Sequence, residues 1–348
     1  MKIHRFLIEN SYSLVNGFKC TIAALFGFLI GYFLSSWFEE PVMTACIIIT
    51  ILVVMSNQPN QGGLLEKSIL RITGTLLATI LGALVLVLFE NFFLRVLLGL
   101  FLVFLSSFLA ATSMFSKYSY GYVLGSATIG LVLLVPNPSI KLALLRGCEV
   151  SIGVFIAIAV NRYILPIKSH SRLCTAYCST LKIFKYLHRS YLHRLPDNII
   201  SEQVFNSFIT QTLLLKESRY ECSKTTLFIF REINISLKKL YCYISVTSEY
   251  IYFYPEEYEK FSTNRDFLLL HSYIEKLLGD LCTNFQKKRI ELYLLTNIQE
   301  TYELVEKLKK TLNRDMGYIG VVVFSINTTL SLIKNIYIHQ EKIFTSSL

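Results

Sequence analysis

The chain has 348 residues, of which 53% are hydrophobic and 17% are charged, and its formal net charge at pH 7 is +10. A typical soluble domain carries about 25% charged residues, so this composition argues against a wholly soluble enzyme and against a disordered or fibrous chain. The charges are unevenly distributed, because residues 1–166 hold 16 of them and residues 167–348 hold 42. We therefore predict a membrane domain over 1–166 and a separate helical domain over 167–348.

Six apolar segments follow one another in the first half. A bilayer core about 30 Å thick needs about 20 apolar residues in a helix. The second segment is shorter than this, which is typical of broken or re-entrant helices in transporters but also of a merely buried helix. We predict an all-α membrane domain of six transmembrane helices. The expected ranges are 15–35, 42–55, 69–89, 92–111, 120–135 and 142–165, with Pro166 ending the last.

The distribution of lysine and arginine sets the expected orientation of these helices. If the N-terminus lies inside, most basic residues fall on the inner side, while the outer loops hold three glutamates and only two basic residues. We therefore expect both termini, and the whole second half, in the cytoplasm. A mild positive charge suits the anionic inner surface of a membrane, whereas the absence of a dense basic run argues against nucleic acid as a partner.

Two ionisable residues fall well inside a span, where they are costly and therefore of functional interest. Arg146 and Glu149 lie three residues apart on one face of the sixth helix. Two interpretations remain open. They can form a mutual ion pair that fixes the helix, or Arg146 can line an anion path in which Glu149 tunes the site or carries a proton.

Three further residues are candidates for anion binding. Arg71 begins the third span, where it can extend to lipid headgroups or bind an anion at the helix terminus. Lys19 begins the first span and is expected mainly to anchor it. Asn57 lies in the polar loop 56–63, which can supply amide donors to a carboxylate or be an ordinary surface turn.

Small residues recur four apart in the spans, a spacing that lets membrane helices approach closely. This pattern predicts packing within the domain, with a subunit interface as the alternative. The residues are Ala23, Gly27 and Gly31 in the first span, Gly74, Ala78 and Gly82 in the third, and Gly121 and Gly125 in the fifth.

The second half shows helical periodicity, with apolar residues three and four apart and charges between them, which predicts an amphipathic bundle. The apolar segment 316–333 is interpreted as a bundle helix instead of a seventh span. Irregular cysteine spacing argues against a disulfide framework, and no nucleotide, metal or catalytic signature is visible, so neither a cofactor nor an enzymatic activity is expected. The predicted helices are 169–195, 199–216, 218–250, 265–295, 298–312 and 318–338.

Several short motifs resemble the fusaric acid resistance (FUSC) and aromatic acid exporter family. The segment 70–77 resembles its R-x-x-G-T motif, and the stretch from Arg146 through Gly153 to Pro166 resembles its sixth-span R…G…P pattern. The stretch 118–136 resembles its fifth span. The layout is similar to that of short inner-membrane members with one six-span half.

This resemblance implies a Gram-negative inner-membrane protein. Long family members, with two membrane halves, are implicated in the efflux of aromatic carboxylic acids together with a periplasmic adaptor. The plant aluminium-activated malate channels are similar in layout and are dimeric anion channels. Because this chain has only one six-span half, a homodimer is the expected assembly.

We therefore predict an exporter of organic anions, with aromatic carboxylic acids as the expected substrates. Arg71 and Arg146 would attract the carboxylate and Glu149 would couple transport to a proton. The alternatives are a passive organic-anion channel and a membrane-anchored scaffold or regulatory protein.

Overall fold

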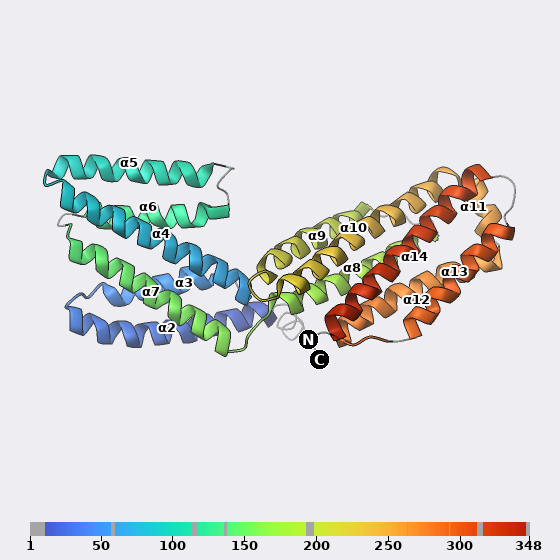
Figure 1. The fold of residues 1–348 in the computed structure, drawn as a ribbon, viewed down its shortest axis with the longest axis horizontal. Helices are drawn as coiled ribbons and strands as arrows, with labels where there is room; N and C mark the ends of the chain where they lie inside the picture. Colours follow the sequence, from blue (N-terminus) through green and yellow to red (C-terminus); the bar gives the residue numbers. More distant parts are fainter. Residues whose placement is uncertain are drawn as a thin grey trace. The chain divides into compact units, whose positions relative to one another are not determined.

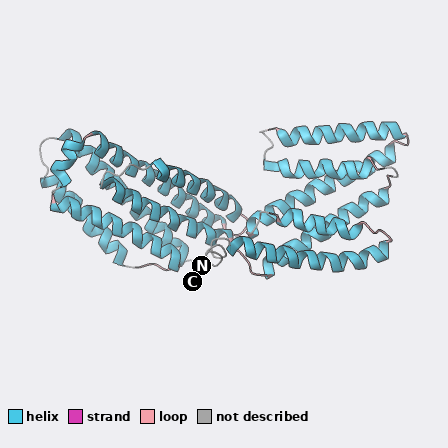
Figure 2. Cartoon of the chain, turned by 180° about the vertical axis from the view of Figure 1, so that it is seen from behind, coloured by secondary structure: helices cyan, strands magenta, loops and turns pink. Residues whose placement is uncertain are grey.

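The computed structural model describes residues 11–56, 60–112, 117–135, 138–192, 198–262, 264–291, 293–311 and 316–345. These ranges are helical apart from short turns and connections, and they contain no β-strand (Figures 1 and 2). The all-α prediction is therefore confirmed. The chain divides into two compact units, Met1–Lys168 and Ser169–Leu348, so the division lies at residue 168 where the sequence suggested 166.

The described residues of the first unit form six apolar helices, one for each predicted span. Four of them, α2, α4, α5 and α7, are long and apolar enough to cross a membrane, whereas α3 and α6 are shorter, with 13 and 15 residues. At 1.5 Å per residue, α3 is only about 20 Å long. The helices are α2 (Ser11–Phe38), α3 (Met43–Met55), α4 (Gln61–Leu88), α5 (Phe92–Ala111), α6 (Ser119–Leu133) and α7 (Ile140–Tyr163).

The short helix α3 packs one face against α2 and α7. Its side chains Ile47, Ile51 and Val54 are fully buried and share one apolar cluster with Val154 and Ala157 of α7. The helix α5, by contrast, lies at the edge beside α6 and exposes most of its apolar surface (Figure 1). Exposed apolar surface of this kind is what a lipid environment requires, whereas water would make it costly.

Glycine allows α4 and α6 to cross at backbone contact. A Cβ atom added to Gly74 would collide with the carbonyl oxygen of Gly121, and one added to Gly121 would lie 3.1 Å from the carbonyl oxygen of Leu70. Gly125 follows one turn later, where an added Cβ would lie 3.3 Å from the carbonyl oxygen of Gly74. The small residues of these two helices thus serve packing within the unit, the first of the two interpretations given above.

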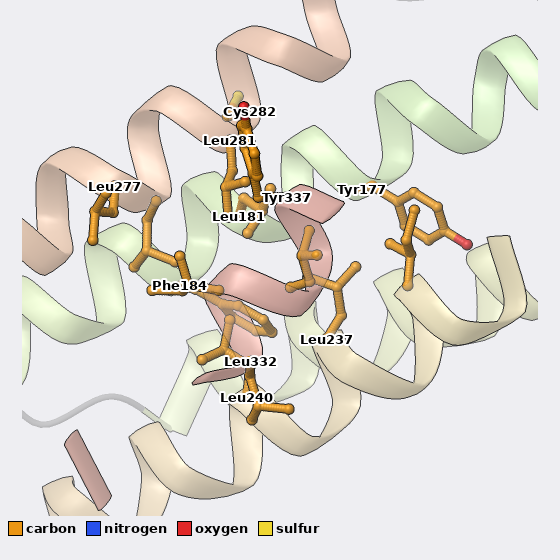
Figure 3. Close-up of a cluster of buried hydrophobic side chains, with 14 of the residues drawn as sticks. Tyr177, Leu181, Phe184, Leu237, Leu240, Leu277, Leu281, Cys282, Leu332 and Tyr337 are labelled. Carbon is orange, nitrogen blue, oxygen red and sulfur yellow. The ribbon is translucent and has the colours of Figure 1, made fainter. Parts of the chain in front are cut away.

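The second unit is a bundle of amphipathic helices with one apolar core. Figure 3 shows side chains of α8, α10, α12 and α14 meeting there, with Tyr177, Phe184 and Tyr337 among the largest. The Tyr177 hydroxyl donates a hydrogen bond to the carbonyl oxygen of Phe230 at 2.8 Å. The helices are α8 (Ser169–Leu192), α9 (Asn198–Ser218), α10 (Lys224–Phe253), α11 (Pro255–Ser262), α12 (Arg265–Lys287), α13 (Tyr293–Thr311) and α14 (Met316–Thr345).

The last helix, α14, is also long and apolar enough to cross a membrane, over Val321–Thr345. It nevertheless packs on α10, and two of its polar side chains, Ser325 and Gln340, bond to other helices of the bundle. The Ser325 hydroxyl donates to the carbonyl oxygen of Tyr243 at 3.0 Å, and the Gln340 amide donates to the carbonyl oxygen of Leu281 at 2.9 Å. The segment therefore belongs to the second unit, as the sequence interpretation has it.

One cysteine pair differs from the sequence interpretation. The sulfur atoms of Cys178 in α8 and Cys282 in α12 lie 2.12 Å apart, as a disulfide between these helices. The two residues are 104 positions apart, so their local spacing in the sequence does not reveal that α8 and α12 pack together.

Candidate functional site

Buried polar side chains follow α7 through the interior of the first unit, where they meet α3 near its start and α2 near its end. Arg146 and Glu149 lie near the start of α7, beside α3. Gly153 lies against Thr50 of α3, where an added Cβ would approach the threonine Cβ to 2.9 Å. Asn161, near the end of α7, contacts α2. At 1.5 Å per residue along α7, Glu149 lies about 6 Å from Gly153, and Gly153 lies about 12 Å from Asn161. The row from Glu149 to Asn161 therefore extends over about 18 Å.

The predicted pair of Arg146 and Glu149 forms an ion pair. Arg146 Nη1 lies 2.8 Å from Glu149 Oε2, and the two side chains are 14% and 4% exposed. The same guanidinium nitrogen contacts the Cys46 sulfur of α3. The geometry therefore matches the first of the two interpretations, in which the charges neutralise each other and fix α7 against α3. An anion path through Arg146 stays a prediction.

Arg71 lies deeper than the sequence interpretation placed it. The helix α4 begins at Gln61, so Arg71 lies ten residues inside it, which corresponds to about 15 Å. The residue is only 9% exposed, and its Nη2 atom donates a hydrogen bond to Thr50 Oγ1 at 3.1 Å. The proposed extension to lipid headgroups is thus wrong for this side chain, because it points to α3 in the interior.

The charge of Arg71 has no acidic partner. Among the described residues no carboxylate lies within ion-pair distance of its guanidinium, and its Nε atom is buried without a hydrogen-bond partner. Thr50 accepts one hydrogen bond but supplies no negative charge. A buried cation in this condition is costly unless an anion compensates it. The site therefore has the chemistry of an anion-binding position, and a guanidinium fits a carboxylate through two parallel hydrogen bonds.

Lys19 is likewise buried, contrary to the expectation that it anchors the end of the first span. It is fully buried on α2, and its ammonium donates to Asn161 Oδ1 at 2.9 Å. In the part of the chain that the structure describes, no carboxylate pairs with Lys19. Asn161 was not singled out from the sequence, although a polar residue within an apolar run was the signal that could have revealed it.

Asn57, the remaining candidate, lies outside the described residues. A cavity of about 280 Å³ lies elsewhere in the unit, between α4, α5 and α6, and was not anticipated from the sequence. Apolar side chains and glycines dominate its lining, with Thr73, Ser106, Tyr118 and Tyr122 as the polar groups. No charged residue lines it, so it does not provide the charge that an anion requires.

The comparison with protein families bears on the part of the chain that holds these contacts. The model of the fusaric acid resistance protein family matches residues 17–221, which include α3–α9 and nearly all of α2. The chain belongs to the fusaric acid resistance protein family. The resemblance noted in the sequence motifs is thereby confirmed. No curated protein matches the chain.

Membership in the fusaric acid resistance family supports a role in membrane transport of organic acids. It agrees with the apolar helices of the first unit, which make this a multi-pass membrane protein. All the polar contacts described above lie within the matched range. In this family member, Arg146 forms an ion pair, whereas Arg71 and Lys19 are buried cations that have no acidic partner among the described residues.

Proposed function

We propose that this protein carries organic anions across the inner membrane, out of the cytoplasm, with aromatic carboxylic acids as the substrate class. One observation supports this most directly: Arg71 is buried, positively charged and without an acidic partner among the described residues. A carboxylate entering the unit would compensate this charge. We further propose that both termini lie in the cytoplasm and that two copies of the chain assemble.

The three basic residues have different parts in this proposal. Arg71 binds the carboxylate, and Lys19, further along the polar row, adds positive potential. Arg146 forms the ion pair with Glu149 and holds it in position. Glu149 is the acidic residue within α7 and is the candidate for proton coupling, since a proton on its carboxylate would break the ion pair with Arg146.

A passive anion channel is the second candidate function. The observation that favours it is the row of polar contacts along α7 from Glu149 to Asn161, which extends through the interior over about 18 Å. The two functions differ in energy coupling. A carrier coupled to protons accumulates its substrate against a gradient and stops when an uncoupler is added, whereas a channel only equilibrates it.

The test is flux of a radiolabelled aromatic acid in proteoliposomes that contain the full chain. We expect Arg71→Ala to lower the apparent affinity by roughly 10- to 100-fold, as for loss of charged hydrogen bonds, and Arg71→Lys to restore part of it. Arg95→Ala is the matched control, because Arg95 lies on the edge helix α5 and donates to the carbonyl oxygen of Glu90. Equal flux in wild type, Arg71→Ala and Arg95→Ala would refute the assignment.

A further inference from the structure

Three donor groups around Arg71 are buried without an acceptor. They are the Nε atom of Arg71 itself, the hydroxyl of Ser68 and the hydroxyl of Tyr120. A buried donor without an acceptor loses the hydrogen bond that water would have given it, so native proteins rarely leave several of them together. A cluster of unsatisfied donors beside an uncompensated cation indicates a missing acceptor that carries negative charge.

The three groups lie on two helices that face each other. Ser68 and Arg71 are three residues apart and therefore share one face of α4. Tyr120 is on α6, near enough to Arg71 to interact with its charge but without completing a hydrogen bond of normal geometry. The close α4–α6 crossing at Gly74 and Gly121 keeps these helices in place.

Lys67 adds a second positive charge next to Tyr120. Its ammonium lies 5.7 Å from the centre of the Tyr120 ring and donates a hydrogen bond to the carbonyl oxygen of Ser56 at 3.0 Å. Lys67 is partly exposed, whereas Arg71, one turn further along α4, is buried. Two positive charges of α4 therefore lie near Tyr120, one partly exposed beside the end of α3 and one buried.

The number and type of donors restrict the ligand. A carboxylate offers two oxygens with about four lone-pair sites, enough for a guanidinium edge and two hydroxyls at once. A halide such as chloride compensates the charge but offers no fixed directions for hydroxyl donors. The donor set thus suits an oxyanion better than a spherical anion.

We propose that Tyr120 and Ser68 complete a carboxylate-binding site with Arg71, and that the Tyr120 hydroxyl selects carboxylates over chloride. This proposal rests on the proposed function only in taking Arg71 as the anion-binding residue. It goes further by assigning the specificity to hydroxyl groups on α4 and α6, on different helices from the ion pair of Arg146.

The test measures benzoate binding to the purified full chain in lipid nanodiscs by calorimetry, with chloride as the competing anion. We expect Tyr120→Phe to weaken benzoate binding by about tenfold or more and to change chloride binding less than about twofold. Ser68→Ala should weaken benzoate binding in the same direction. Tyr118→Phe is the matched control, because Tyr118 is 47% exposed and its ring faces Lys117.

The outcomes separate this proposal from the proposed function. If Arg71→Ala abolishes benzoate binding while Tyr120→Phe and Ser68→Ala bind like Tyr118→Phe, the selectivity proposal is wrong and the role of Arg71 stands. If Tyr120→Phe weakens benzoate and chloride equally, the hydroxyl does not select between them. If Arg71→Ala binds benzoate like the wild type, both proposals fail. Thermal unfolding midpoints within a few degrees of the wild type show that the variants are folded.

Discussion

At the scale of single residues, the buried charges of the first unit fall into two kinds. Arg146 has its carboxylate, whereas in the described part of the chain Arg71 and Lys19 donate to neutral oxygens, those of Thr50 and Asn161. Breaking an ion pair leaves a buried charge, while removing an uncompensated cation removes the cost of burying it. Substitution of Arg146 should therefore mainly reduce stability, whereas substitution of Arg71 or Lys19 should mainly reduce anion binding.

Removing Arg146 should destabilise the protein. We expect Arg146→Ala to lower the free energy of unfolding by about 3–5 kcal/mol, because Glu149 would be left buried without its partner. The double variant Arg146→Met with Glu149→Leu should recover most of this loss. Thermal unfolding in detergent measures both, and an Arg146→Ala variant as stable as the wild type would show that the ion pair does not fix α7.

A pair of histidines in the second unit should make its stability depend on pH. His188 of α8 and His271 of α12 are buried, with His271 Nδ1 and His188 Nε2 2.9 Å apart. Burial lowers the pKa of His188 to about 4, and burial together with the neighbouring His188 lowers the pKa of His271 well below its ordinary value. Both rings are therefore neutral in the folded protein near pH 7.

The sign of the effect follows from proton binding. Between about pH 6.5 and pH 4 the unfolded chain takes up protons that the folded bundle does not, so the free energy of unfolding falls as the pH falls. We expect the denaturant midpoint of the second unit to decrease from pH 7 to pH 5. The double variant His188→Leu with His271→Met should reduce this decrease, and an unchanged slope would contradict the assignment to this pair.

Single residues also show which buried contacts can be predicted from the sequence and which cannot. Hydropathy and charge identified Arg146 and Glu149 as an intramembrane pair, since they are close in sequence and on one face. The same patterns placed Lys19 and Arg71 at the ends of spans although both are buried. Their partners are 142 and 21 residues away, and no local pattern encodes such a contact. Thr50 was overlooked within an otherwise aliphatic run.

At the scale of helices, apolar periodicity predicted the elements well and their ends poorly. The third span was expected from residue 69, but α4 begins at Gln61, because the polar residues before Arg71 continue the helix although hydropathy assigns them to a loop. The short helix α11 was not predicted, and it begins at Pro255, a residue favoured in the first turn of a helix. Such boundaries depend on capping and tertiary contacts more than on hydropathy.

The crossing of α4 and α6 should be sensitive to one methyl group. We expect Gly74→Ala to destabilise the first unit by roughly 1–3 kcal/mol, because the added Cβ would collide with the Gly121 carbonyl oxygen and force the helices apart. Gly130→Ala is the matched control on α6, since nothing lies within 4 Å of a Cβ there. Thermal unfolding compares the two, and equal midpoints would show that the crossing tolerates side chains.

At the scale of the whole molecule, the side of the membrane on which the C-terminus lies depends on α14. Its length and hydropathy allow a membrane span, but it packs within the second unit. The composition of the chain reveals the two units but cannot separate a buried bundle helix from a span, because both are apolar. Only the contacts with α10 and α12 distinguish them.

A pair of reporter fusions tests this arrangement. We expect alkaline phosphatase fused after Lys168 and after Thr345 to report the same side of the membrane, because no span intervenes if α14 is a bundle helix. An insertion near Asn91, between α4 and α5, should report the opposite side and serves as the control. Opposite results at the first two positions would show that α14 crosses the membrane.

The contact between Lys19 and Asn161 also has a consequence for biosynthesis. Its two residues are 142 positions apart, so at about 5–20 residues per second the ribosome needs roughly 7–28 s to deliver Asn161 after Lys19. During that interval the newly inserted α2 carries an ammonium group whose final partner has not been made. We therefore expect α2 to reach its final packing only after α7 has been made.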